Sequence, residues 1–164
     1  MKKIKMICAM FLAVICGLMV GCGAIIEDLE DSSSAVGGKI GFEILRCFNE
    51  HDSETLKDMF CPYVQRTHDL DSEIAEAFEI IDNEIISYGN FISGGETLYE
   101  EGNIIYKDIT CRMPIKMTNN EKYNICFFYM ETNKNENLVG IKRISIYNEE
   151  PDTLLCIVGS EATK

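Results

Sequence analysis

Residues 105–117, IYKDITCRMPIKM, decide the fold of this chain. Apolar residues occupy every second position from Ile105 to Met117, and only Lys107 interrupts them. Polar residues such as Asp108 and Arg112 fill most of the positions between. Side chains along a β-strand point alternately to its two faces, so this pattern predicts a long strand with one apolar and one wet face. Such a strand is typical of an antiparallel sheet that covers a core on one side.

A second strand follows the pair Asn119-Asn120, which favours a hairpin turn. We assign Cys126, Phe128 and Met130 to its inner face, beside Ile109, Cys111 and Met113 of the first strand. The outer face then carries an exposed patch made of Tyr123, Ile125, Phe127 and Tyr129. A further strand is expected from Leu138 to Tyr147, and a short edge strand from Leu154 to Val158.

Three helices are expected before the strands. The first is indicated by the spacing of Ile40, Ile44, Cys47 and Phe48, which places all four on one helical face. The second is capped by Asp52 and ends at Pro62, and a polar loop follows. The third carries the stripe Ile74, Ala77, Phe78, Ile81 and Ile85, with Asp69 or Asp71 as its cap. Helices packed in a curved antiparallel sheet give an α+β domain with a concave interior.

The N-terminus has the order of a secretory signal. Lys2, Lys3 and Lys5 precede an apolar run of about 14 residues, shorter than the ~20 that a membrane-spanning helix needs. The position of Cys22 after this run resembles a lipoprotein signal, in which that cysteine is lipidated with diacylglycerol and palmitate-like chains. We therefore expect a protein anchored by lipid to the extracytoplasmic face of the cell membrane. The expected organisation is signal peptide 1–21, flexible acidic, Ser- and Gly-containing tether 22–38, domain 39–158 and frayed C-terminus 159–164.

Composition fits one globular domain and excludes one class of partner. The chain has 164 residues, 46% hydrophobic and 26% charged. Its formal net charge is −12, from 15 basic and 27 acidic residues. Because such a surface repels phosphate, we expect no nucleic-acid partner, and membrane attachment must come from the lipid.

Five cysteines remain in the expected domain, an odd number: Cys47, Cys61, Cys111, Cys126 and Cys156. Small secreted domains commonly carry disulfides, so one bridge is one interpretation. The alternative is that all five are reduced, because most lie in apolar runs where a free thiol packs as a small hydrophobe.

Two stretches, CFNEHD at residues 47–52 and LKDMF at residues 56–60, are similar to the opening of nuclear transport factor 2-like domains. The stretches PYV (62–64), ISYG (86–89) and ISIYN (144–148) resemble a family of uncharacterised lipoproteins of low-GC Gram-positive bacteria. The resemblance covers roughly residues 39–148 and implies a cone, with a sheet wrapped around helices and a pocket at the open end. Its superfamily hosts isomerases, dehydratases, binding modules and scaffolds, so the fold alone fixes no activity.

No motif points to a metal or a cofactor, since the two histidines and the widely spaced cysteines lack ligand spacing. Cys61 lies near His51 and His68 in the sequence, but its apolar neighbours favour core packing, and both histidines are expected to face solvent. Our hypothesis is a module that binds an unknown small ligand or protein. Its pocket would be lined by Phe48, Phe60, Phe78, Ile109, Cys111, Met113, Phe128 and Met130, although the same residues would serve as ordinary core.

Two alternatives stay open. The first is a pocket enzyme of the isomerase or hydrolase type, using a carboxylate such as Asp108 or Glu131 with a tyrosine such as Tyr88, Tyr106 or Tyr129. The second is a scaffold or homodimer that pairs through the outer face of the sheet.

Overall fold

The computed structural model describes residues 32–160, which form four helices, a seven-stranded sheet and one short 3-10 helix. The helices are α2 (Ser33–Glu50), α3 (Ser53–Asp58), α4 (Pro62–Thr67) and α5 (Leu70–Ile80). The strands are β1 (Ile85–Tyr88), β2 (Ile92–Gly94), β3 (Thr97–Glu100), β4 (Asn103–Met117), β5 (Lys122–Asn133), β6 (Gly140–Asn148) and β7 (Leu154–Gly159), with η1 (Glu136–Leu138) before β6.

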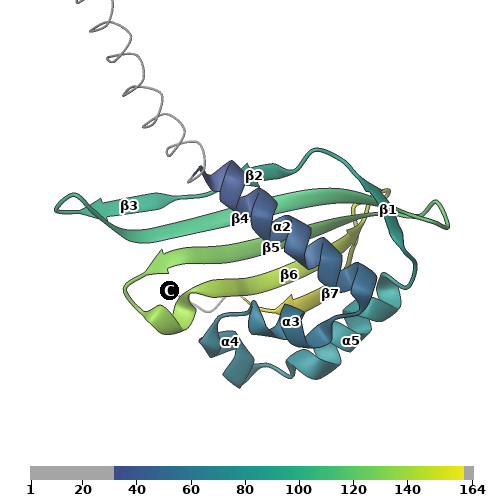
Figure 1. The fold of residues 1–164 in the computed structure, drawn as a ribbon, viewed down its shortest axis with the longest axis horizontal. Helices are drawn as coiled ribbons and strands as arrows, with labels where there is room; N and C mark the ends of the chain where they lie inside the picture. Colours follow the sequence, from purple (N-terminus) through teal and green to yellow (C-terminus); the bar gives the residue numbers. More distant parts are fainter. Residues whose placement is uncertain (1–31, 161–164) are drawn as a thin grey trace, which may run out of the picture.

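The sheet is antiparallel throughout and is built around β4, the strand from which the sequence argument began. The strand order is β1-β4-β5-β6-β7, and the short strands β2 and β3 also pair with β4. Figure 1 shows α2 crossing one face of the sheet, with α3, α4 and α5 beside its β7 end. The expected α+β class, with helices first and an antiparallel sheet after them, is confirmed.

Helix α2 begins earlier than the sequence indicates. Ser32 caps it by accepting a hydrogen bond from the backbone N–H of Ala35, and the helix runs from Ser33. Its two inward glycines allow a close approach: a Cβ at Gly37 would lie 3.3 Å from Ile109, and one at Gly41 would lie 2.6 Å from the Met113 sulfur. The expected tether was wrong over residues 33–38, because these residues pack on the sheet as part of the domain.

Capping residues define the ends of the helices that precede the sheet, and the sequence predicts only some of them. His51 ends α2 in the left-handed conformation, and Asp52 caps α3 by accepting from the Thr55 N–H. Asp69 caps α5 in the same way. Pro62, however, begins α4 instead of opening a polar loop, because proline suits the first turn of a helix, where its missing N–H is not needed.

The core lies between α2, α5 and the inner face of the sheet. Cys111 pairs directly with Phe127, and Met113 pairs with Ile125, so these four residues share the inner face, where all are buried. The expected orientation of β5 was therefore wrong. Ile125 and Phe127 cannot contribute to an exposed outer patch, and Tyr123 and Tyr129 pack against the core beside them. Cys126, Phe128 and Met130 occupy the opposite face.

Hydrogen bonds fix the C-terminal end of the domain at Gly159 and Ser160, where we expected a frayed terminus. Gly159 belongs to β7 and its N–H donates to a carboxylate oxygen of Glu73 at 2.6 Å, while the Ser160 hydroxyl bonds the His68 ring. Gly159 and Ser160 thus belong to the folded domain, whereas residues 161–164 lie outside the described part of the chain.

All five described cysteines are free thiols. Cys126 is half-buried and the other four are buried. This agrees with the interpretation of reduced cysteines that pack as small hydrophobes.

The expected signal peptide, Cys22 and the first part of the tether fall outside the residues that the structure describes. Within residues 32–160, no helix combines the length and apolar character needed to cross a membrane.

Candidate functional site

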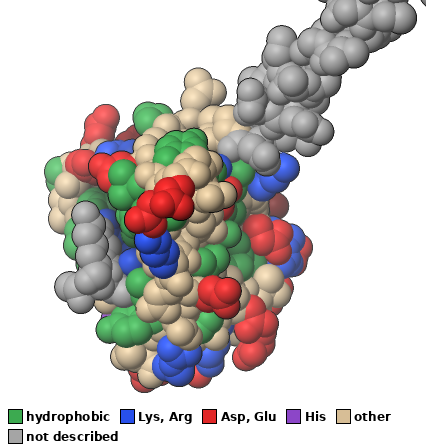
Figure 2. All heavy atoms as spheres, turned by 90° about the vertical axis from the view of Figure 1, so that its left-hand side faces the viewer, with side chains coloured by type: hydrophobic (Ala, Val, Ile, Leu, Met, Phe, Trp, Pro, Cys, Tyr) green, Lys and Arg blue, Asp and Glu red, His purple; other side chains and the backbone are tan. Residues whose placement is uncertain are grey.

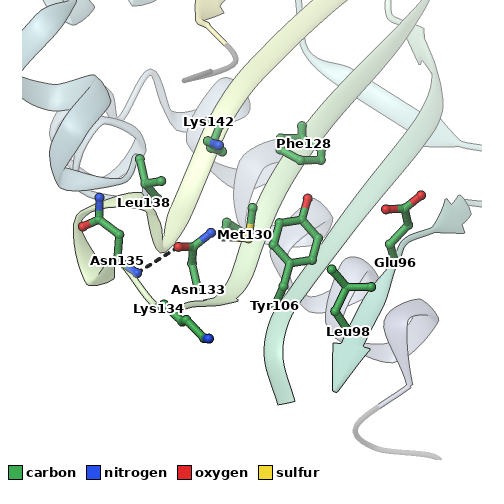
Figure 3. A pocket seen from close by; sticks show the side chains of 10 residues that line it. All are labelled: Glu96, Leu98, Tyr106, Phe128, Met130, Asn133, Lys134, Asn135, Leu138 and Lys142. Carbon is green, nitrogen blue, oxygen red and sulfur yellow. Dashed lines mark hydrogen bonds between the residues drawn. The ribbon is translucent and has the colours of Figure 1, made fainter. Parts of the chain in front are cut away.

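A groove of about 460 Å³ lies on the outer face of the sheet, opposite α2. Its floor is apolar and comes from four strands and the 3-10 helix (Figure 3). Phe128, Met130 and Tyr106 lie in the middle, with Leu138 at one side and Leu98 at the other. We call this hollow the outer groove; its lining is Glu96, Leu98, Tyr106, Phe128, Met130, Asn133, Lys134, Asn135, Leu138 and Lys142.

Two β-bulges shape the outer groove. Between β5 and β6 the register shifts after Phe128, which pairs with Arg143, while Tyr129 pairs with Ile141. Lys142 is the extra residue of this bulge. Between β4 and β5 a second shift makes Glu131 the extra residue. Bulges re-aim side chains and are frequent beside functional sites, and here they lie on either side of Met130.

Lys142 is the charged group most deeply placed in the outer groove. Only 4% of the residue is exposed, and its ammonium lies 5.6 Å from the centre of the Phe128 ring. A cation at this distance over an aromatic face is attracted by the negative charge of the π-system. The buried ammonium and the ring together form one wall that is both positive and aromatic.

The opposite wall is fixed by Asp108, of which 7% is exposed. One of its oxygens accepts from the Tyr106 hydroxyl at 2.5 Å, and the other accepts from the backbone N–H of Glu96 at 3.0 Å. Both carboxylate oxygens are thus engaged in holding the wall. Asp108 and Tyr106, two of the groups named for the alternative of a pocket enzyme, thus hydrogen-bond each other, and the carboxylate fixes the position of the Tyr106 hydroxyl.

A second hollow, of about 440 Å³, lies on the inner face, where the chain between α3 and α4 meets the start of β6. Cys61 N–H donates to the Ile141 carbonyl, and Ile141 N–H donates to the Met59 carbonyl, each at 2.9 Å. Gly140 has φ +125°, and a Cβ there would meet the Cys61 backbone nitrogen at 2.8 Å, so only glycine permits this contact. We call this the inner hollow; its lining is Ile40, Asp58, Met59, Phe60, Pro62, Gln65, Tyr129, Val139, Gly140 and Ile141.

Tyr129 is a titratable group that lines the inner hollow. Burial, together with the negative charge of Glu131, raises the pKa of its phenol above the ordinary value. Glu131 in turn pairs with Lys107 of β4, with 3.0 Å between the ammonium and each carboxylate oxygen. This ion pair neutralises the charges that interrupt the inner face.

The eight residues expected to line one pocket are divided between three places. Phe128 and Met130 line the outer groove, and Phe60 lines the inner hollow. Phe48, Cys111 and Met113 belong to the core, and Phe78 packs against it. Ile109 is fully buried beneath α2 near Gly37. The sheet thus separates residues that were expected together.

His68 is not a solvent-facing residue, contrary to expectation. Its Nδ1 lies 3.0 Å from a Glu73 oxygen and its Nε2 lies 3.0 Å from the Ser160 hydroxyl. The order of groups, hydroxyl, imidazole and carboxylate, is that of a hydrolase triad. The chain of bonds also joins the end of β7 to α5, and neither the outer groove nor the inner hollow includes these residues.

Sequence reasoning missed several residues of the outer groove, chiefly Glu96, Leu98, Leu138 and Lys142. The available signal was a lysine inside the apolar stretch of β6 and the apolar character of both faces of β5. Among residues 32–160 no group of three or more His, Cys, Asp or Glu side chains could hold a metal ion.

Figure 2 shows the end of the molecule that carries the β3–β4 hairpin, where hydrophobic side chains lie between acidic and basic ones. The fold and its two hollows define an α+β domain that presents cavities on both faces of one antiparallel sheet. The family model described as a domain of unknown function, DUF5104, matches residues 43–149, and the chain therefore belongs to the DUF5104 family. No curated protein matches the chain.

Proposed function

We propose that this protein is a lipid-anchored, extracytoplasmic binding module that holds a small apolar ligand in the outer groove. In this proposal the domain is of the nuclear transport factor 2-like type, and Cys22 carries the lipid. The ligand-binding part of this proposal rests on the apolar floor of the groove. The volume of the groove also lies inside the usual range of ~300–1,000 Å³ for ligand sites.

The geometry of the floor favours a ligand over a filled core. Met130 has 1% of its surface exposed, but it lies on the face opposite the core and borders the groove. Leu98 is 53% exposed at the far side. An apolar molecule laid across the groove would cover the exposed side chain of Leu98, and each Å² of apolar surface removed from water would contribute about 25 cal/mol.

The binding test uses Nile red, a neutral apolar fluorophore, and the chain from residue 22 onward with Cys22→Ala. This is the mature chain of the proposal without its lipid, and it contains every residue that the structure describes. We expect saturable one-to-one binding that Phe128→Ala weakens at least tenfold. The matched control is Tyr88→Ala, an aromatic that is 54% exposed outside the groove. Binding lost in Tyr88→Ala but kept in Phe128→Ala contradicts the proposal.

The anchor is supported by the basic start, the short apolar run and Cys22 at its end. A lipid with two chains gives stable attachment at about 0.8 kcal/mol per buried methylene. Metabolic labelling of the full chain with a fatty-acid analogue tests it. Label that disappears in Cys22→Ala supports the anchor, and label that persists in this variant rules it out.

A serine hydrolase is the second candidate, favoured by the hydrogen-bonded chain from Ser160 through His68 to Glu73. In such a site the imidazole takes the hydroxyl proton as Oγ attacks a carbonyl carbon, and the carboxylate fixes the imidazole tautomer. Treatment of the folded protein with a fluorophosphonate probe distinguishes the candidates. Labelling of Ser160 that His68→Gln abolishes supports the hydrolase, whereas an unlabelled Ser160 leaves the bonds a structural link between β7 and α5.

A further inference from the structure

We infer that an apolar edge of the sheet docks on the phospholipid surface of the membrane and so orients the anchored domain. This inference rests on the lipid anchor proposed at Cys22, and it concerns a surface apart from the outer groove. We call this surface the aromatic edge; its side chains are Phe42 of α2, Ile86 and Tyr88 of β1, Phe91 directly before β2, and Ile92 of β2.

Three rings of the aromatic edge pack against one another at the surface. The centre of the Phe42 ring lies 5.2 Å from that of Tyr88 and 5.0 Å from that of Phe91, and the Tyr88 and Phe91 centres are 5.6 Å apart. Phe91 is half-buried, whereas the other four side chains of the edge are each at least 50% exposed. The ring contacts give this surface a defined shape, while its apolar side chains stay open to solvent.

Charged residues are nearly absent from the segments that form the aromatic edge. Residues 85–95, IISYGNFISGG, carry none, and the first ten residues of α2, 33–42, carry only Lys39. At the chain's average of 26% charged residues, about five would be expected in segments of this combined length. Lys39 is exposed and precedes Phe42 by one helical turn. A lysine beside exposed rings suits the head-group layer, where the ammonium meets phosphate and the rings reach the acyl chains.

The charged side chains that border the aromatic edge are paired with one another. The pairs are Glu43 with Arg46, Arg112 with Asp152, and Lys122 with Glu149. Each pair is neutral, and Glu84 and Glu96 flank the uncharged segment only at its two ends. The chain has a net charge of −12, which repels anionic lipid, so a surface with little negative charge is the one suited to contact it.

The aromatic edge lies on the side of the domain that the anchor would reach. Helix α2 begins at Ser33, and β2 lies against its first turns, since a Cβ at Gly37 would be 2.9 Å from the Ser93 hydroxyl oxygen. Figure 1 shows the start of α2 beside β2. The ten peptide steps from Cys22 to Ser32 span at most about 35 Å. A domain tethered this closely meets the membrane at a high effective concentration, so even a weak apolar contact would be occupied.

The size and shape of the aromatic edge favour lipid over a second copy of the chain. Its four exposed side chains offer roughly 400 Å² of surface, half of the ~800 Å² that each partner of a standard interface buries. Pairing of sheet edges would need a continuous strand, but β1 ends at Tyr88 and β2, with three residues, begins at Ile92. A fluid head-group layer needs neither a large nor a regular surface.

The test uses an introduced tryptophan, because the chain contains none of its own. Tyr88→Trp places the reporter in the aromatic edge, and Tyr63→Trp places a control on α4, away from the start of α2 (Figure 1). Both are made in the chain 22–164 with Cys22→Ala and an N-terminal hexahistidine. This tag binds vesicles of phosphatidylcholine and phosphatidylglycerol that contain a nickel-chelating lipid. Bromine atoms near the head-group end of the acyl chains quench a tryptophan that contacts them.

We expect these brominated lipids to reduce the fluorescence of Tyr88→Trp at least twofold and to leave that of Tyr63→Trp unchanged. Equal quenching of the two variants would show that the domain presents no preferred face to the membrane, and it overturns the inference. Quenching of neither variant overturns it as well.

A charge in the aromatic edge should prevent docking. Ile92 pairs with Arg112 across β2 and β4, so a glutamate at this exposed position faces a cation and the fold should tolerate it. Ile92→Glu in the Tyr88→Trp chain should reduce quenching to the level of Tyr63→Trp. Leu154→Glu adds the same charge to β7, at the other edge of the sheet, and should leave quenching unchanged. Quenching that survives Ile92→Glu, or that both variants abolish equally, overturns the inference.

Sedimentation of the same chain without vesicles tests the rival occupant, a second copy. We expect a monomer, and a dimer that Ile92→Glu dissociates overturns docking on lipid. The hexahistidine tether does not depend on Cys22, so the two proposals fail separately. Fatty-acid label that persists in Cys22→Ala removes the anchor, whereas absent quenching beside a label that Cys22→Ala abolishes removes only the docking.

Discussion

Phe127 lies directly opposite Cys111 across β5 and β4, and both side chains are buried in the core. Because side chains alternate along a strand, Phe128 must point to the other face of the sheet. Strand β5 has two apolar faces: one packs into the core, and the other lines the outer groove.

The two adjacent phenylalanines should respond differently to truncation. Phe127→Ala leaves a cavity in the core and should lower the free energy of unfolding by about 3–5 kcal/mol. Phe128→Ala removes a half-buried ring from the groove and should cost less than about 2 kcal/mol. Urea unfolding of both variants measures the difference. Equal losses would contradict the placement of these rings on opposite faces.

Two glycines of α2 provide a test of how the helix packs. Gly38→Ala should raise the free energy of unfolding by about 0.5–1 kcal/mol, because alanine favours the helix and nothing lies within 4 Å of the new Cβ. Gly41→Ala should lower it by about 1–3 kcal/mol, because its Cβ would meet the Met113 sulfur at 2.6 Å and the Phe91 ring at 3.0 Å. Thermal unfolding measures both. Stabilisation by Gly41→Ala would show that α2 does not lie against β4 as described.

Burial should make two of the thiols inert in the folded protein. Burial raises the pKa of both Cys47 and Cys156 to about 11. At pH 8 both stay protonated, and since the thiolate is the reactive form, iodoacetamide should modify neither until urea unfolds the chain. Mass spectrometry of the alkylated peptides measures this. Rapid modification of Cys47 in the folded protein would contradict its burial.

The same thiols predict how stability depends on pH. Their pKa is higher in the folded than in the unfolded state, so between pH 9 and 11 the unfolded chain binds fewer protons. The stability they contribute is complete below pH 9 and is lost as the pH rises towards 11. Urea unfolding at pH 8 and pH 10.5 should show a loss, and Cys47→Ala should make that loss smaller. An unchanged or increased stability at pH 10.5 would contradict the prediction.

The alternation in β4 and the cap Asp52 could be predicted from the sequence, and Asp69 was one of the two caps predicted for α5, because each is a local signal. The orientation of β5 was not. Both of its faces are apolar, so the register depends on the turn that joins β4 to β5, and a shift of one residue exchanges the two faces. The start of α2 was missed for a different reason, since Gly37 and Gly38 suggest a flexible segment when the sheet beneath them is unknown.

The candidate site was harder to predict than the fold. Phe128 and Met130 were expected in a ligand pocket on the inner face, and the structure places them in the outer groove, on the opposite face. Lys142 enters the groove through a bulge, and no local pattern in the sequence marks that irregularity. The contact between His68 and Ser160 joins residues 92 positions apart, which only the fold brings together.

The methionine methyl groups offer the most direct test of ligand binding in the outer groove. Met130 borders that groove, Met59 borders the inner hollow, and Met113 lies in the core. With ¹³C-methyl methionine in the chain 22–164 carrying Cys22→Ala, titration with Nile red should shift the Met130 signal and leave the Met59 and Met113 signals in place. A shift of Met59 with Met130 unmoved would transfer the site to the inner hollow and contradict the account.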